Sequence, residues 1–487
     1  MNKIIILFLA TILLGSCAPK KEKLKLDKPN IILIFTDDQG YADIGANNIT
    51  KEVKTPNIDK LIAGGVQFNN GYVTAPQCAP SRAGIMTGRY QQRFGFDDND
   101  LGPIPNNEIT IAERLQKIGY TTGMVGKWHL DPNHTSKPWL KEHHPELLEE
   151  EPIKIPKGLR MEHSPESNGY DEYFWGTMLN YHANYDLDGD YLSRGRNIND
   201  ERFRIDVQSD AAIQFLDNNK DNTFFLYLSY FGPHVPLESS QEYLDMHDEI
   251  EVQRRKYGLS MISGIDKGVG RILNKLEELN IADNTIIFYL SDNGAPLKLT
   301  KPDTPITGIP GPEWDGSIND PWLGEKGMLT EGGVHVPYIV YWKNKIEGGR
   351  VLEFPVSSLD FASTALALAD SIKTDGLDGI NLMPYLEGKN TEAPKRNLFW
   401  RFWNQAAIRA DNWKYLRVGT ELEFLFDLSR KEHEGINLID SNREIADSLK
   451  VYLSDWADEL KYKGLSKEKM NGQEKDWYKY HLGAEVH

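Results

Sequence analysis

The chain has 487 residues, of which 40% are hydrophobic and 10% aromatic, so it can bury a large core in more than one domain. Its formal net charge is −17 and no basic stripe runs through it, which argues against nucleic acid as a partner. An acidic protein that binds an anion must gather its cations locally, which makes clustered lysine, arginine and histidine residues informative.

The N-terminus reads as a processing segment. Lys3 precedes an apolar run over residues 4–14, which is too short to span a bilayer, and this pattern predicts an export signal over residues 1–16. The run ends in Leu-Gly-Ser-Cys at Cys17, which resembles a bacterial lipobox and implies cleavage before Cys17 and lipidation of its thiol. An ordinary secretory signal is the alternative. Residues 17–28 are expected to be a tether, and the resemblance implies lipid anchoring to the membrane at the bacterial cell envelope, facing the periplasm or the surface.

Apolar strands alternate with helical patterns along most of the chain, which predicts an α/β fold with a large sheet flanked by helices. The expected long strands and the helices between them are residues 30–35, 120–125, 223–230 and 285–290, and residues 55–63, 109–118, 206–218 and 254–279. Shorter strands are expected at 66–72 and 336–342, and a further helix at 357–369.

A polar cluster follows each of the four long strands. The clusters are Asp37 with Asp38, Lys127 with His129, His234, and Asp292 with Asn293. In open α/β sheets ligands bind at the carboxyl ends of the strands, so we expect these side chains to share one pocket. The two adjacent aspartates, taken alone, fit a helix cap or solvated turn equally well, whereas as ligands their hard oxygens suit calcium or magnesium.

Cys78 lies in the stretch from Pro76 to Arg89, which predicts a turn that opens a short buried helix. Arg82 follows about one turn later, so its cation can return to the neighbourhood of the cysteine. A buried cysteine is most often simply a small hydrophobic residue. Here, however, lipidation of Cys17 would leave Cys78 without a disulfide partner in an exported protein, because the chain has 2 cysteines.

The string Cys-Ala-Pro-Ser-Arg at 78–82, followed by Ala-Gly-Ile-Met-Thr-Gly-Arg, resembles the signature of the type I sulfatases. Further similar strings are Gly-Lys-Trp-His at 126–129, Gly-Pro-His ending at His234, and the segment from Lys326 to Pro337. Where that last string usually carries an arginine, this chain has His335, which puts the arginine's salt bridge in doubt. The resemblance implies the alkaline phosphatase-like fold from about Lys28 to the C-terminus.

The resemblance also implies roles for the site residues. Cys78 would be converted to formylglycine by a maturase, and its hydrated gem-diol, bound to one Ca²⁺, would attack sulfur. Protein ligands of the calcium would be Asp37, Asp38, Asp292 and Asn293, joined by residue 78. Arg82, Lys127 and Lys326 would hold the diol and sulfate oxygens. His234 would protonate the departing alcohol, and His129 would deprotonate the second hydroxyl.

The remaining segments are expected to surround this centre. Residues 131–165 and 298–323 read as polar surface loops. The polar and aromatic segment 181–186 could either line a sugar-binding cleft or pack internally, which makes His182 a candidate substrate-binding residue. From about residue 397 short alternating strands and a helix at 443–460 predict a small antiparallel sheet with one helix. The expected domains are 29–390, the catalytic domain, and 391–487.

The function expected from these features is sulfuric ester hydrolysis on a sulfated polysaccharide or oligosaccharide, with algal glycans such as ulvan or carrageenan favoured. One alternative is a phosphodiesterase or phosphonate hydrolase of the same superfamily, which relative rates on aryl sulfate and aryl phosphodiester would separate. The other is a non-catalytic glycan-binding lipoprotein, against which the complete ligand set argues.

Overall fold

The computed structural model describes residues 28–176, 178–297, 316–369 and 376–484. The expected export signal, Cys17 and most of the 298–323 loop lie outside the described residues. Within these ranges no helix combines the length and the apolar character that crossing a bilayer requires.

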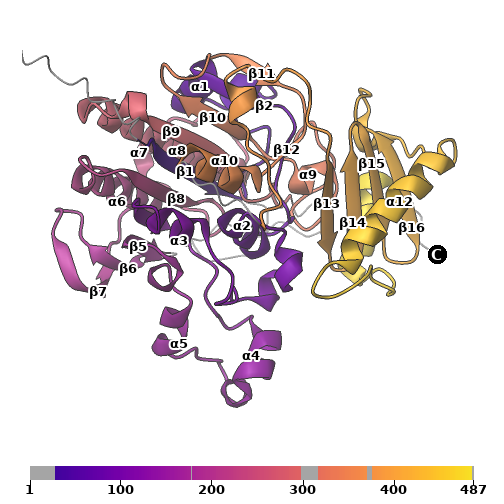
Figure 1. Ribbon diagram of the computed structural model, residues 1–487, viewed down its shortest axis with the longest axis horizontal. Helices are drawn as coiled ribbons and strands as arrows, with labels where there is room; N and C mark the ends of the chain where they lie inside the picture. Colours follow the sequence, from indigo (N-terminus) through magenta and orange to yellow (C-terminus); the bar gives the residue numbers. More distant parts are fainter. Residues whose placement is uncertain (1–27, 177, 298–315, 370–375, 485–487) are drawn as a thin grey trace, which may run out of the picture.

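A large mixed sheet of ten strands, counted over the described residues, forms the centre of the molecule (Figure 1). Its order is β11-β2-β10-β9-β1-β8-β4-β5-β6-β7. The strands are β1 (Asn30–Asp37), β2 (Gly65–Phe68), β4 (Thr121–Gly126), β5 (Glu172–Gly176), β6 (Asn180–Tyr185), β7 (Tyr191–Asn199), β8 (Phe224–Pro233), β9 (Thr285–Ser291), β10 (Tyr338–Trp342) and β11 (Arg350–Leu352). Neighbours β9, β1, β8 and β4 are parallel, so their carboxyl ends meet at one edge.

Helices cover both faces of this sheet because its central strands are apolar on both sides. Along β1, Ile31 and Leu33 face one core and Ile32 and Ile34 face the other, following the two-residue period of a strand. The first core includes residues of α2 (Cys78–Thr87), α3 (Ile111–Gln116) and α10 (Asp360–Leu368). The second includes residues of α1 (Pro56–Ala63), α6 (Arg204–Asn218) and α8 (Gln253–Glu278).

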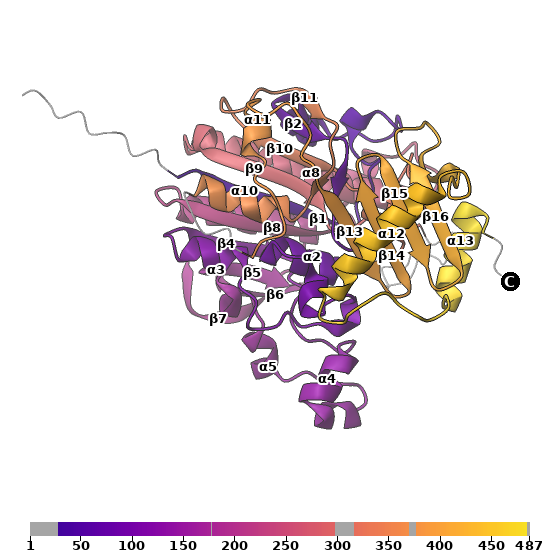
Figure 2. The same cartoon turned by 45° about the vertical axis from the view of Figure 1, so that its right-hand side comes forward.

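A second, four-stranded antiparallel sheet stands beside the large one, with α12 lying across it (Figure 2). Its strands are β13 (Asn397–Phe402), β14 (Gln405–Ala410), β15 (Trp413–Val418) and β16 (Leu422–Asp427). The expected helix is α12 (Arg443–Asp458), and a second helix, α13 (Gly472–Leu482), covers the other face. The predicted fold class is thereby confirmed, with α13 added to the one helix expected.

Three segments differ from the expectation. Residues 131–165 contain α4 (Lys137–His143) and α5 (Lys157–Glu162), and they bury Leu140 fully, so this stretch is a folded excursion. The strand expected over 66–72 divides into β2 and β3 (Gly71–Tyr72), and β3 pairs instead with β12 (Val356–Ser357). The described end of the 298–323 loop is partly buried, because Ser317 and Asn319 bond to the segment after β1 and to Ala295.

The remaining short helices are α7 (Gln241–Asp245), α9 (Glu331–Val334) and α11 (Met383–Leu386).

Candidate active site

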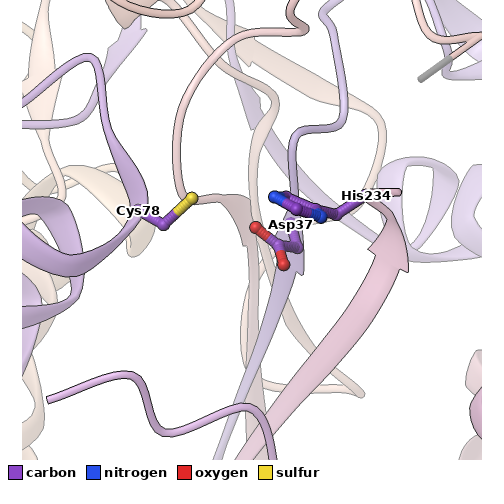
Figure 3. A group of neighbouring side chains, drawn as sticks. All are labelled: Asp37, Cys78 and His234. Carbon is purple, nitrogen blue, oxygen red and sulfur yellow. The ribbon is translucent and has the colours of Figure 1, made fainter. Parts of the chain in front are cut away.

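The predicted polar clusters meet at the carboxyl edge of the parallel strands. Asp37 ends β1, and Figure 3 shows its side chain between those of Cys78 and His234. Asp38 follows with a φ of 66°, and its backbone N–H donates to Asp292 across the strand pair at 3.1 Å. At the end of β4, Gly126 has a φ of 98°, and a Cβ there would lie 1.9 Å from the carbonyl oxygen of Ser229. This close approach of strands admits only glycine and places Lys127 over the centre.

Cys78 is the first residue of α2, as predicted, and the whole helix is buried. The thiol Sγ lies 3.0 Å from Lys326 Nζ and 3.9 Å from Asp38 Oδ1. Burial raises the pKa of the Cys78 thiol, although the nearby charges of Lys127 and Lys326 oppose this shift. An unmodified cysteine here is therefore protonated and is a poor nucleophile.

Each carboxylate of the cluster has its own cation. Lys127 Nζ lies 2.6 Å from Asp37, and Lys326 Nζ lies 2.6 Å from Asp38. The fully buried Arg82 places its guanidinium 2.6 Å from Asp292 and also donates to Ser229 and Tyr227. These pairs keep the charges together in a buried site. The structure thus brings Arg82, Lys127 and Lys326 to the cluster, where each of them lies against a carboxylate.

The arrangement of oxygen atoms fits a hard divalent cation. One ligand atom from each of Asp37, Asp38, Cys78 and Asp292 lies within 4.8 Å of all the others. Within the described residues Asp37 Oδ1 and Asn293 Oδ1 are buried and accept no hydrogen bond, and the cation of Arg82 approaches Asp37 Oδ1 only to 3.5 Å, at Nη2. Burial, together with the charge of Asp37, raises the pKa of Asp292 to about 7. Carboxylates this close repel each other when all are ionised, and some buried oxygens have no hydrogen-bond donor. Ca²⁺ or Mg²⁺ would bind such a set of oxygens.

The two histidines of the site differ in their surroundings. His129 adopts a φ of 60°, and its Nδ1 is buried without a hydrogen-bond partner among the described residues. Burial and the charges of Lys127 and Arg82 hold the pKa of His129 well below its usual value, so the ring is neutral and can accept a proton.

His234 is oriented by its own loop. Its Nδ1 donates to the carbonyl oxygen of Val235 at 2.5 Å, which leaves Nε2 facing Asp38 at 3.7 Å. Burial lowers the pKa of His234 to about 4, although the charge of Asp37 opposes the shift. The nitrogen available to a substrate is therefore Nε2.

Arg204 holds this loop and was not singled out by the sequence. It is 1% exposed, and its guanidinium donates to the carbonyl oxygens of His234 and Pro236 at 2.9 and 2.6 Å. The same guanidinium lies 4.6 Å from the centre of the Phe231 ring, which contacts His234 edge-on. Arg204 is the first residue of α6, where the helix dipole disfavours a cation. An arginine at a helix N-terminus is therefore the feature of the sequence that could have indicated a special role for this residue.

A cleft of about 850 Å³ opens beside the site. His129 and Trp128 form part of its wall, and His182 lines it from β6, where its ring stacks on Tyr173. The Nδ1 of His182 lies 3.0 Å from Asn197. The predicted candidate is thus placed in a cleft that adjoins the cluster of Asp37, Asp38, Cys78 and Asp292, which we call the catalytic cluster.

His335 takes the place of the arginine expected from the resemblance, and it keeps a polar contact with Glu331. Its Nδ1 lies 2.9 Å from the Glu331 carboxylate and its Nε2 lies 2.7 Å from the carbonyl oxygen of Asn69. A neutral imidazole has one N–H, so only the protonated ring satisfies both acceptors. Burial lowers the pKa of His335, and Glu331 opposes the shift. Lys414 reaches the same carboxylate at 2.7 Å from β15, so this buried group links the small sheet to α9.

Replacing His335 with alanine should therefore lower the free energy of unfolding by about 3 kcal/mol, because buried acceptors lose their donor. Chemical denaturation would measure the change. The matched control is His433→Ala, since both His335 and His433 contact the Trp322 ring, but His433 is only half-buried and bonds one carbonyl. The control should cost less than about 1 kcal/mol. Equal losses in the two variants would show that the Glu331 contact adds nothing to stability.

Comparison with known families was consistent with this geometry. The Sulfatase family model matches residues 29–371. A second model, described as N-sulphoglucosamine sulphohydrolase, C-terminal, matches residues 321–459. The human N-acetylgalactosamine-6-sulfatase is 31% identical over 399 residues, covering 75% of this chain and 67% of the relative.

Two solved structures extend the comparison. One, described as Ps i-CgsB in complex with k-i-k-neocarrahexaose, is 29% identical with a TM-score of 0.73, covering 93% of this chain and 97% of the other. A phosphonate monoester hydrolase of Agrobacterium radiobacter shares the fold, with a TM-score of 0.60 and 21% identity over 89% of this chain and 96% of its own. The family match covers most of the chain and includes every strand end that forms the site. The chain accordingly belongs to the sulfatase family, the enzymes that hydrolyse sulfuric esters.

Proposed function

We propose that this protein removes sulfate from a sulfated polysaccharide or oligosaccharide, with an algal glycan such as carrageenan or ulvan as the favoured substrate. The observation that carries the proposal is the 850 Å³ cleft, which shares His129 with the candidate active site and is lined by amides, hydroxyls and tryptophans. Such a lining suits sugar hydroxyls and sugar faces. The similarity to a structure described with a bound neocarrahexaose supports the same class.

A formylglycine at position 78 would supply the nucleophile. A Ca²⁺ ion held by Asp37, Asp38, Asp292 and Asn293 would stabilise negative charge on the sulfate. Lys127 and Lys326 would neutralise sulfate oxygens, because both charges act on residue 78 and Lys326 Nζ lies 3.0 Å from its Sγ. His129 is neutral and can accept a proton.

His234 is assigned as the proton donor to the departing alcohol. Its Nδ1 is occupied by Val235, so the proton would leave from Nε2. With a pKa of about 4, His234 is unprotonated at neutral pH in the free protein, so the bound substrate must raise this pKa before the ring can donate a proton. An incoming sulfate brings negative charge next to the ring and raises its pKa, so the ring gains its proton when the substrate binds.

The function is tested by incubating the purified, matured protein with a panel of sulfated oligosaccharides and measuring released sulfate. We expect turnover on at least one glycan in the panel, at a rate well above that for an unrelated simple alkyl sulfate. Faster hydrolysis of an aryl phosphodiester than of any sulfate ester would favour the phosphodiesterase alternative. Binding of glycans without any sulfate release would favour a non-catalytic lipoprotein.

The modification of Cys78 makes a separate prediction. Because burial raises the pKa of its thiol, the unmodified residue should not support turnover, and active protein should contain formylglycine. Mass spectrometry of the peptide that spans residue 78, from protein made with and without a co-expressed maturase, measures the conversion. Activity should rise in proportion to it. An active preparation with only intact cysteine would contradict the assignment.

Lipidation of Cys17 and residence at the cell envelope belong to the same proposal and are tested by labelling with a lipid precursor.

A further inference from the structure

One wall of the cleft carries two cations that the catalytic assignments leave unused. Lys157 and Arg160 lie three positions apart on α5, hence on the same side of that helix, and both line the cleft. We call this pair the α5 wall. The chain as a whole is acidic, with a net charge of −17, so two cations facing one cleft are a local departure from its composition.

Arg160 is held in a fixed position. Its Nε and Nη2 lie 2.8 and 2.7 Å from the same oxygen, Oδ2 of Asp131, which is 8% exposed. Its guanidinium also lies 5.6 Å from the centre of the Trp175 ring, which is 6% exposed. A guanidinium has five N–H donors, of which Asp131 takes at most two, so at least three remain. The Arg160 side chain is 48% exposed, so these donors are accessible from the cleft.

The rest of the lining describes the ligand. Its amide and hydroxyl side chains are Asn99, Asn133, Thr135, Asn180, Tyr181 and Asn197. The described acidic side chains that line the cleft are Asp131, already bound to Arg160, and Asp100. The volume is near the upper end of the roughly 300–1,000 Å³ of small-molecule sites, so it holds more than the group that reacts.

We propose that the α5 wall binds a second anionic group of the substrate, a sulfate or a carboxylate, while the scissile sulfate occupies the catalytic cluster. Arg160 presents its free N–H donors to the oxygens of this group, and Lys157 adds charge beside it. The preferred substrate is therefore an oligosaccharide with at least two anionic groups. This inference rests on the proposed function, because it assumes that the cleft binds the glycan.

The test compares three matched oligosaccharides, chosen from the glycan that the panel identifies. One carries only the sulfate that is released, the second carries an additional sulfate, and the third carries a uronic carboxylate in its place. The variants are Arg160→Met and Lys157→Met. Arg194→Met is the control, because Arg194 is an exposed arginine of β7 that does not line the cleft.

Arg160→Met should reduce kcat/KM roughly 10- to 100-fold on the dianionic substrate it recognises, mainly through KM, as expected for a lost charged hydrogen bond. On the monosulfated form the loss should stay below about threefold. Lys157→Met should give a smaller loss with the same selectivity, and Arg194→Met none. Comparison of the second and third substrates tells whether sulfate or carboxylate is bound.

Equal losses on monosulfated and dianionic substrates, or no loss on any, would overturn the inference. If Arg160→Met misfolds without its Asp131 contact, Lys157→Met decides, because Lys157 is exposed and its replacement leaves the fold intact. The proposed function fails differently: the wild-type protein would then release no sulfate from any saccharide.

Discussion

Removing the bound divalent cation should abolish sulfate release, with a loss of about three orders of magnitude or more, and Ca²⁺ should restore it. The reason is the cluster of Asp37, Asp38 and Asp292, whose ligand atoms converge within 4.8 Å while two buried oxygens accept no hydrogen bond in the described chain. Dialysis against a chelator, followed by assays with added Ca²⁺, Mg²⁺ or Zn²⁺, measures the effect. Oxygen ligands should favour the first two over zinc.

The matched variants are Asp38→Ala and Asp43→Asn. Asp38 belongs to the cluster, whereas Asp43 is a fully buried aspartate that pairs with Arg255 at 2.8 Å outside it. Metal content per chain, measured by mass spectrometry, should fall only in Asp38→Ala. Full activity in metal-free protein, or restoration by Zn²⁺ alone, would contradict a hard-cation site.

Replacing His234 with alanine should cost roughly two to four orders of magnitude on sugar sulfates, the usual range for loss of a general acid. The loss should be clearly smaller on an activated aryl sulfate, because a nitrophenolate leaves without a proton and a sugar alkoxide does not. Steady-state rates on both substrates measure the difference. Equal losses on the two would show that His234 binds sulfate instead of donating a proton.

Two further variants separate the parts of this assignment. Arg204→Met removes the donor that bonds the carbonyl oxygens of His234 and Pro236, so it should show a weaker form of the same leaving-group dependence. Arg202→Met is its control, since Arg202 lies two residues earlier in exposed ion pairs with Asp200 and Asp210. His129→Ala should slow both substrates alike, because the proton it accepts does not come from the departing alcohol.

Much of the site was readable from the sequence because its signals are local. The run from Asn30 to Phe35 is apolar without interruption, which is typical of a strand buried on both faces, and Asp37 follows where such a strand ends. The same logic placed Lys127, His234 and Asp292 at neighbouring strand ends. The cysteine string at 78–82 then linked them to a family. Some local signals went unread besides Arg204: Thr110 with Glu113 and Asn471 with Glu474 form capping boxes at the starts of α3 and α13.

The tertiary structure alone decided which carboxylate each cation pairs with and which other segments pack against the site. Lys326 reaches Asp38 although the two are 288 residues apart, and Lys414 of the small sheet reaches Glu331 of the catalytic part. Arg204 bonds the His234 loop, and Arg160 lies on Trp175, from segments that local patterns describe only as a helix start and a polar excursion. A local pattern reports periodicity and polarity within one element, whereas these contacts depend on the order of strands in the sheet and on how loops pack over its edge. For this protein, therefore, sequence determined the strand-end chemistry, and packing determined its cation partners and the cleft that receives the substrate.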